Sequence, residues 1–281
     1  MLRTRFSAKP LTTADRDAAL SLCARDPARH VFVAARILES TTDGSLHGLL
    51  GHWERGELTS ICWSSANVVP VETDAAARTA FAERMRRWRG STASILGPSE
   101  EVAELWQRLE PAWGPPRAVR THQPLMTTRT RPSTLGLDVD DRVRPALPTE
   151  VDAVVPAAAH MFTHEIGYPP YTGSSRAYRS AVGALIARGH TYVLMDRGEV
   201  LFKADIGSLA LGCAQVQGVW LAPHLRGSGR SAALLGAVVE QILADGVAEV
   251  SLYVNDYNRA ARALYARLGF ATVGSFTTVL L

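Results

Sequence analysis

The apolar and polar positions of the chain predict the same series of elements twice. Stretches with a period near 3.6 residues predict helices, and short runs rich in β-branched residues predict strands. A strand near 3–8 is followed by elements at 14–23, 26–39, 47–54, 57–65, 67–71, 74–89, 94–96, 99–109 and 119–128. A strand at 143–146 is followed by elements at 150–162, 174–188, 191–195, 200–206, 213–221, 231–244, 249–254, 258–268 and 270–281. Each half therefore reads as strand, two helices, hairpin, strand, helix, strand, helix and strand.

Turn residues support these boundaries and divide the chain in two. Arg55-Gly56 and Arg197-Gly198 are typical of β-hairpin turns, and Gly269 is typical of a helix C-terminus. Residues 131–141 mix Pro, Gly and Ser with little periodicity, which predicts a linker. We therefore predict two domains, residues 1–130 and 142–281. Each is expected to be an α+β sandwich in which helices flank a mixed, mostly antiparallel sheet.

One strand–turn–helix unit of the second half carries the clearest sign of a ligand. The predicted strand at 213–221 is followed by Arg226-Gly227-Ser228-Gly229-Arg230-Ser231 and then by an apolar helix. A helix start offers unpaired N–H groups and a partial positive charge, and glycines allow a phosphate to approach closely. The turn therefore predicts an anion site. The corresponding residues 69–74 of the first half contain no glycine and two acids, so we expect them to repel a phosphate.

Composition narrows the class of protein further. The 281 residues are 47% hydrophobic and 20% charged, with a formal net charge of +3, which suits two soluble globular domains. No dense basic run stands beside an aromatic RNA-binding motif, so no nucleic-acid partner is expected. No apolar run reaches ~18 residues and the first residues lack a signal core, so we expect no membrane partner and a cytoplasmic location. The three cysteines form no CxxC pair and predict core residues rather than a zinc site or disulfides.

Two segments of the second half resemble motifs of the GNAT acetyltransferase superfamily. The glycine turn resembles the loop that binds the pyrophosphate of acyl-CoA, Arg/Gln-x-x-Gly-x-Gly/Ala. Arg226 and Gly229 match this pattern, and Ser231 replaces its last small residue. Residues 258–270 resemble the Asn-x-x-Ala-x-x-x-Tyr-x-x-x-Gly-Phe segment, with matches at Asn258, Ala261, Tyr265, Gly269 and Phe270. The whole chain is similar to an actinobacterial two-domain type, in which a degenerate GNAT-like domain without a phosphate loop precedes a catalytic GNAT domain.

The resemblance implies an N-acetyltransferase that uses acetyl-CoA as cosubstrate. Backbone groups of Val219 and Leu221 would face the pantetheine arm, and Asn258 would hydrogen-bond the cofactor or cap its own helix. Tyr265 would be the general acid that protonates the leaving thiolate, or else a packed aromatic. The amides that would hold the pyrophosphate are those of Arg226, Gly227, Ser228, Gly229, Arg230 and Ser231.

The general base is left open by the resemblance. Many relatives have a glutamate on the strand before the phosphate loop, where this chain has Gln215 and Gln217. The proton could leave through water, through Glu165 at the start of a predicted loop, or through Asp205. Asp205 lies in an apolar strand, where a buried salt bridge is the alternative explanation.

The acceptor and the partners are the least determined part of the prediction. We expect a primary amine of a small molecule or peptide, with Tyr168 and Tyr171 as candidates to line its site, and a homodimer is an open possibility. His160 and His164 are four residues apart, but the order His-Glu-x-x-His and a third ligand are missing, so we expect no metal. The alternatives are a tandem GNAT enzyme similar to mycothiol synthase and a catalytically silent protein for CoA binding or partner recognition.

Overall fold

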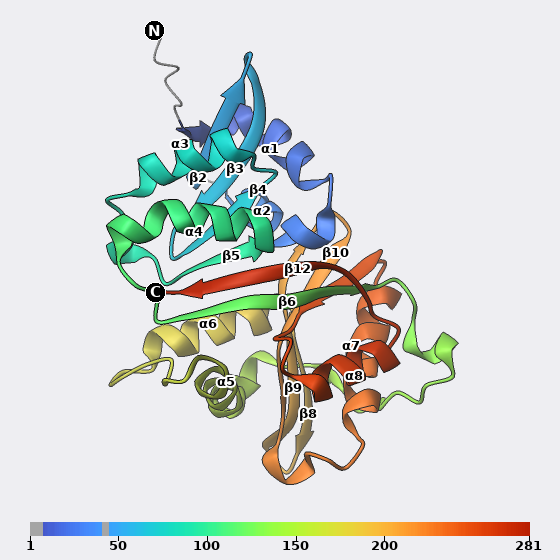
Figure 1. The fold of residues 1–281 in the computed structure, drawn as a ribbon. Helices are drawn as coiled ribbons and strands as arrows, with labels where there is room; N and C mark the ends of the chain where they lie inside the picture. Colours follow the sequence, from blue (N-terminus) through green and yellow to red (C-terminus); the bar gives the residue numbers. More distant parts are fainter. Residues whose placement is uncertain (1–7, 41–44) are drawn as a thin grey trace, which may run out of the picture. The chain divides into compact units, whose positions relative to one another are not determined.

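A computed structural model of the chain describes residues 8–40 and 45–281, so the strand predicted near 3–8 lies almost entirely outside the described residues (Figure 1). The chain forms two compact units. Unit 1 comprises residues 1–126, 253–258 and 272–281, and unit 2 comprises residues 127–252 and 259–271. The predicted domains are continuous segments, whereas these units are not, because the last strand belongs to unit 1.

Unit 1 contains a mixed sheet with the strand order β1-β2-β3-β4-β5-β12-β6. Its strands are β1 (Lys9–Thr12), β2 (Ser45–Glu54), β3 (Glu57–Ser64), β4 (Asn67–Val71), β5 (Ser94–Pro98), β6 (Ala118–Thr128) and β12 (Ala271–Leu280). Its helices are α1 (Arg16–Cys23), α2 (Pro27–Glu39), α3 (Ala75–Met85) and α4 (Ser99–Trp113). Helices α3 and α4 pack together over a core in which Phe81, Leu105 and Leu109 are fully buried (Figure 1).

Unit 2 contains the strand order β11-β10-β9-β8-β7. Its strands are β7 (Arg144–Pro145), β8 (Thr191–Asp196), β9 (Glu199–Ala210), β10 (Cys213–Leu221) and β11 (Glu249–Tyr253). Its helices are α5 (Val151–Ile166), α6 (Arg176–Ala187), α7 (Ser231–Ala244) and α8 (Arg259–Arg267). Helices α5 and α6 pack on one side of the sheet, and α7 and α8 lie on the other side (Figure 1).

The predicted repetition of elements is present in the two units. In unit 1, β2, β3 and β4 form an antiparallel meander, and β4 then pairs with β5 in parallel. In unit 2, β8, β9 and β10 form the same meander, and β10 then pairs with β11 in parallel. The predicted fold class, helices flanking mixed and mostly antiparallel sheets, is therefore confirmed.

The segment predicted as a linker, residues 131–141, packs against α7 and is part of unit 2. The backbone N–H and hydroxyl of Ser133 donate to the carboxylate of Glu240 at 3.0 and 2.8 Å, and the N–H of Asp140 donates to the carbonyl of Ala233 at 3.1 Å. At Gly236 of α7, an added Cβ would lie 3.4 Å from Val139, so the segment and the helix approach closely. A lack of periodicity here indicates an irregular but ordered segment.

Helix α3 begins with a side-chain cap that yields a stability prediction. Asp74 has an extended backbone and its Oδ1 accepts the N–H of Ala77 at 2.7 Å. Replacing Asp74 with Ala leaves that N–H unpaired, so we expect the free energy of unfolding to fall by about 0.5–2 kcal/mol. Chemical denaturation of the full chain measures this change. Asp74→Ser should retain most of the stability, and Glu83→Ala on the same helix should cost less; equal losses for Asp74→Ala and Glu83→Ala would contradict the capping role.

Candidate functional site

Strand β10 departs from regular geometry near its end. Between Gln217 and Trp220 the register shifts, so that Gly218 and Val219 both face the single residue Ala204 of β9. This is a β-bulge, which leaves one residue outside the ladder and re-aims the strand. Gly218 has φ +62°, a left-handed conformation that glycine adopts without strain.

The other edge of β10 separates from β11. The parallel pairing joins residues 213–215 to residues 249–251, and the described residues show no further pairing of β10 with β11 toward Leu221. Val219 and Leu221, the residues predicted to face a cofactor arm, are half-buried on this part of the strand. An unpaired strand edge presents N–H and C=O groups that an extended ligand with amide groups can bond.

The glycine turn after β10 follows a short helical turn (Pro223–Leu225) and leads directly into α7. Gly227 and Gly229 have φ values of +76° and +78°, and a Cβ at either position would meet no atom within 4 Å. Backbone conformation, rather than crowding, therefore requires glycine in this turn. The space around the two glycines is open to a ligand.

The six predicted amide donors of the turn are not equivalent. The N–H groups of Arg226 and Ser228 donate to carbonyls three residues earlier, at 3.2 and 3.3 Å. The N–H groups of Gly227, Gly229 and Arg230 have no acceptor among the described residues, and Ser231 begins α7. The free donors and the positive end of the helix lie in one turn, which is the arrangement that binds phosphate groups.

The two arginines of the turn have different surroundings. Arg226 is exposed, and its Nε donates to the carbonyl of Leu221 at 3.1 Å. A nitrogen of Arg230 lies 3.7 Å from the carboxylate of Asp140. Hydrogen bonds from Arg142 hold the pKa of Asp140 below its usual range, so this carboxylate is ionised and offsets part of the Arg230 charge. Arg226 is thus the less neutralised cation of the turn.

Tyr265 lies on α8 and is 8% exposed. Its ring centroid is 6.0 Å from that of Phe270. Burial, and to a lesser extent the charge of Glu165, raise the pKa of Tyr265 to about 12. The phenol is therefore protonated at neutral pH, as a proton donor must be.

Asn258 lies at the predicted start of its helix, whereas the prediction that Glu165 begins a loop is wrong. Helix α5 continues to Ile166 and ends at Gly167, whose φ is +89°, so Glu165 lies in the last helical turn and not in a loop. The helix continues because residues 163–166 contain no breaker before that glycine. Asn258 is exposed and directly precedes α8, and its N–H donates to the carbonyl of Asn255 at 2.9 Å.

The titration of Tyr265 gives a prediction that does not depend on substrate. With a pKa raised to about 12, the folded state keeps this phenol neutral at pH values where an unfolded tyrosine, with a pKa near 10, ionises. The stability linked to Tyr265 is complete below about pH 10 and is lost as the pH rises toward about 12. In an ultraviolet titration of tyrosinate, Tyr265→Phe should remove one tyrosine from the latest phase. Loss of a tyrosine from the phase near pH 10 would contradict the burial of this phenol.

The two histidines of α5 are separated by their contacts. His160 Nδ1 accepts a hydrogen bond from Trp220 Nε1 at 3.0 Å, and the two rings meet edge to face at 5.9 Å. This bond occupies the Nδ1 lone pair, and His164 is exposed in the following turn. His160 therefore holds the side chain of Trp220 on β10, and His164 takes no part in this contact.

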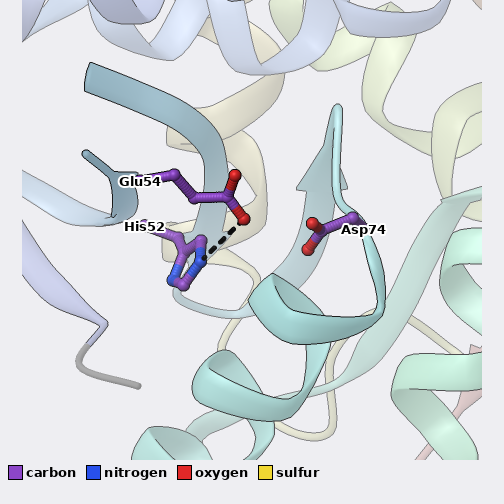
Figure 2. Close-up of side chains that lie close together, drawn as sticks. All are labelled: His52, Glu54 and Asp74. Atoms are coloured by element: carbon purple, nitrogen blue, oxygen red, sulfur yellow. Dashed lines mark ion pairs between the residues drawn. The ribbon is translucent and has the colours of Figure 1, made fainter. Parts of the chain in front are cut away.

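A group of potential metal ligands that sequence reasoning missed lies in unit 1. His52, Glu54 and Asp74 each place a ligand atom within 4.8 Å of the others, and His52 Nε2 is 3.8 Å from Glu54 Oε1 (Figure 2). Asp74 lies 20 residues after Glu54 in the sequence, so the spacing of these residues does not predict a metal site. His52 Nδ1 is buried without a hydrogen-bond partner, although metal-ligating histidines normally donate their other N–H to an acceptor. One oxygen of Asp74 is also used to cap α3.

Two family models match separate parts of the chain. Residues 161–270 match the family model "Acetyltransferase (GNAT) family", and residues 47–154 match a domain of unknown function, DUF4081. No curated protein matches the sequence.

Several solved structures share the fold over nearly the full chain. A GCN5-related N-acetyltransferase from Sphaerobacter thermophilus is 17% identical, with a TM-score of 0.60, and the match covers 100% of this chain and 97% of that one. A GNAT-family acetyltransferase from Colwellia psychrerythraea is 14% identical, with a TM-score of 0.56 and coverage of 98% and 100%. A tandem GNAT protein from the clavulanic acid biosynthesis pathway is 12% identical, with a TM-score of 0.56 and coverage of 98% of each chain.

Proposed function

We propose that the chain transfers an acetyl group from acetyl-CoA to a primary amine of a small molecule or peptide, because its residues 161–270 match the GNAT acetyltransferase family model. The observation that carries the proposal is the succession of three features in unit 2. These are the bulge of β10, its separation from β11, and the turn of free amides at the start of α7. A pantetheine arm would lie along the open edge of β10, and its pyrophosphate would meet the turn.

The chemistry requires an amine free of its proton, a polarised thioester carbonyl and a proton for the leaving thiolate. Tyr265 suits the last task, because burial keeps its phenol protonated and the reaction ends with a thiolate that needs a proton. Glu165 interacts electrostatically with Tyr265 and is the candidate base, or the first acceptor of a proton that leaves through water. Each turnover forms an amide bond, breaks the thioester bond and yields CoA thiol.

The start of α3 in unit 1 differs from the start of α7 in unit 2, and this difference supports one cofactor site per chain, in unit 2. At the equivalent point after β4, Thr73 donates from its N–H and hydroxyl to Glu101 at 2.8 and 2.5 Å. Asp74 accepts from Ala77 N, and Glu72 has φ +54°. The chain's own carboxylates thus occupy donors at the start of α3, and they would repel a phosphate. We propose that unit 1 does not bind CoA.

The test of the proposed function is release of CoA thiol from acetyl-CoA in the presence of a panel of primary amines. Cys23, Cys62 and Cys213 are buried, and burial raises the pKa of Cys23 to about 12, so the native chain should add little background to a thiol reagent. We expect amine-dependent thiol release with at least one class of amine. Tight CoA binding with no turnover of any amine, and no effect of Tyr265→Phe, would support the silent CoA-binding alternative instead.

A further inference from the structure

A buried ion pair lies directly against the bulge of β10. Lys203 is 1% exposed and Asp205 is 6% exposed, and Nζ lies 2.5 Å from Oδ2. The second carboxylate oxygen accepts the hydroxyl of Thr191 at 2.9 Å, and Lys203 Nζ also donates to the carbonyl of Gly218 at 3.3 Å. The ion pair therefore joins three neighbouring strands of unit 2, β8, β9 and β10.

The pair fills the space beside the bulge. A Cβ added at Gly218 would lie 2.8 Å from Asp205 Oδ2 and 3.1 Å from Lys203 Nζ. Glycine at 218 is thus required twice, by its φ of +62° and by the volume that the pair occupies. Asp205, a candidate base by sequence, is held in a salt bridge, and Lys203 contacts the carboxylate oxygen that lies nearest Gly218.

A buried pair of this kind calls for a reason beyond stability. Removing two charges from water costs several kcal/mol per ion, and apolar residues of similar size are often as stable or more stable. Lys203 and Lys9 are the only lysines of the chain, and all its other Lys/Arg positions are arginine. The compact ammonium of Lys203, on its flexible stem, contacts both a carboxylate and a carbonyl beside the bulge.

We propose that the Lys203–Asp205 pair positions the acyl group by fixing the peptide between Gly218 and Val219. In a planar trans peptide the C=O and N–H point in opposite directions. Because Lys203 holds the carbonyl of Gly218, the N–H of Val219 is directed away from the pair. This inference rests on the proposed function: the fixed N–H donates to the thioester carbonyl of bound acetyl-CoA and stabilises its developing negative charge.

The experiment follows the carbonyl itself and needs no acceptor amine. Acetyl-CoA labelled with ¹³C at the thioester carbonyl is added to the full chain, and the difference infrared spectrum is recorded. In the unsubstituted protein we expect the labelled band to move to lower frequency on binding, because a hydrogen bond weakens the C=O bond. In Lys203→Met/Asp205→Leu, which replaces both charges with apolar groups, we expect acetyl-CoA to bind with an affinity within about 3-fold, whereas the shift is lost.

Matched variants separate positioning from general damage. Arg78→Met/Glu104→Leu removes an ion pair of unit 1, whose guanidinium and carboxylate are 3.1 Å apart, and should keep the full shift. Thr191→Val removes only the hydroxyl that holds Asp205, and it supplies a mild variant with a reduced shift if the double variant does not fold. With an amine that is turned over, kcat of the Lys203→Met/Asp205→Leu variant should fall on the order of 10²-fold while KM for acetyl-CoA changes little.

Two results would overturn the inference while the proposed function stands. One is binding of acetyl-CoA to the unsubstituted protein without a carbonyl shift. The other is a full shift and an unchanged kcat in the double variant. Absence of any acetyl-CoA binding by the unsubstituted protein would overturn the proposed function first and this inference with it.

Discussion

Replacing Tyr265 with Phe is expected to lower kcat for acetyl transfer by about 10²–10⁴-fold, the usual contribution of a general acid. The substitution removes one hydroxyl from a side chain that is 8% exposed and leaves its ring packed against Phe270. The affinity for CoA should therefore stay close to that of the unsubstituted chain. Steady-state thiol release and a CoA titration of the same preparation measure the two quantities.

Tyr192→Phe is the matched control for this prediction. Tyr192 lies on β8 of unit 2, is 4% exposed, and has a pKa raised by burial, as Tyr265 has. The control loses a buried hydroxyl from the same unit without touching α8, so its kcat should remain within about 3-fold of the unsubstituted value. Equal losses in the two variants would show that Tyr265 acts through packing and not through its proton.

Gly229→Asp is expected to weaken CoA binding by about 10²-fold. The residue has φ +78°, a conformation that costs a side chain about 1–2 kcal/mol. A carboxylate beside the cofactor phosphates adds about 1 kcal/mol or more of repulsion in a solvated site. The backbone cost falls on the free and the bound chain alike, so the loss of affinity comes from the repulsion. A repulsion of about 3 kcal/mol, within the ~1–4 kcal/mol range for unit charges about 4 Å apart, corresponds to roughly two orders of magnitude in the dissociation constant. Calorimetric titration of the full chain with CoA measures the change.

Gly198→Asp gives the control for the backbone cost alone. Gly198 lies in the hairpin between β8 and β9 with φ +84°, and a Cβ there would also meet no atom within 4 Å. Both variants should lose a similar free energy of unfolding, and only Gly229→Asp should lose CoA affinity. A CoA dissociation constant for Gly229→Asp equal to that for Gly198→Asp would show that the turn does not hold the phosphates.

Local sequence was a good guide to the elements and to the turn. The order of strands and helices in both halves follows from periodicity, because each element buries one apolar face in its own unit. The glycine turn was identifiable because two left-handed residues and a helix start lie within six positions. The family motifs added the proposed role of Tyr265 as a general acid, whereas periodicity alone predicts a packed aromatic.

What sequence could not supply depends on contacts between distant segments. Helix α5 continues past Glu165 and ends only at Gly167, a boundary that the apolar pattern did not predict. The packing of residues 131–141 on α7 depends on distant pairs such as Ser133 with Glu240. The ion pair at the bulge joins Thr191, Asp205 and Gly218, which come from three strands. From the sequence, Asp205 in an apolar strand could be a catalytic base or a member of a buried salt bridge. The structure shows the salt bridge, with Lys203 two residues earlier on the same strand.

The most direct test of the account is the stoichiometry of CoA binding to the full chain. Unit 2 offers free amides at the start of α7, whereas carboxylates of unit 1 occupy the equivalent donors. Calorimetric titration should give one CoA per chain, and Gly229→Asp should abolish or greatly weaken that single event. Two binding events per chain, or one event that survives Gly229→Asp unchanged, would contradict the assignment of the cofactor site to the turn of unit 2.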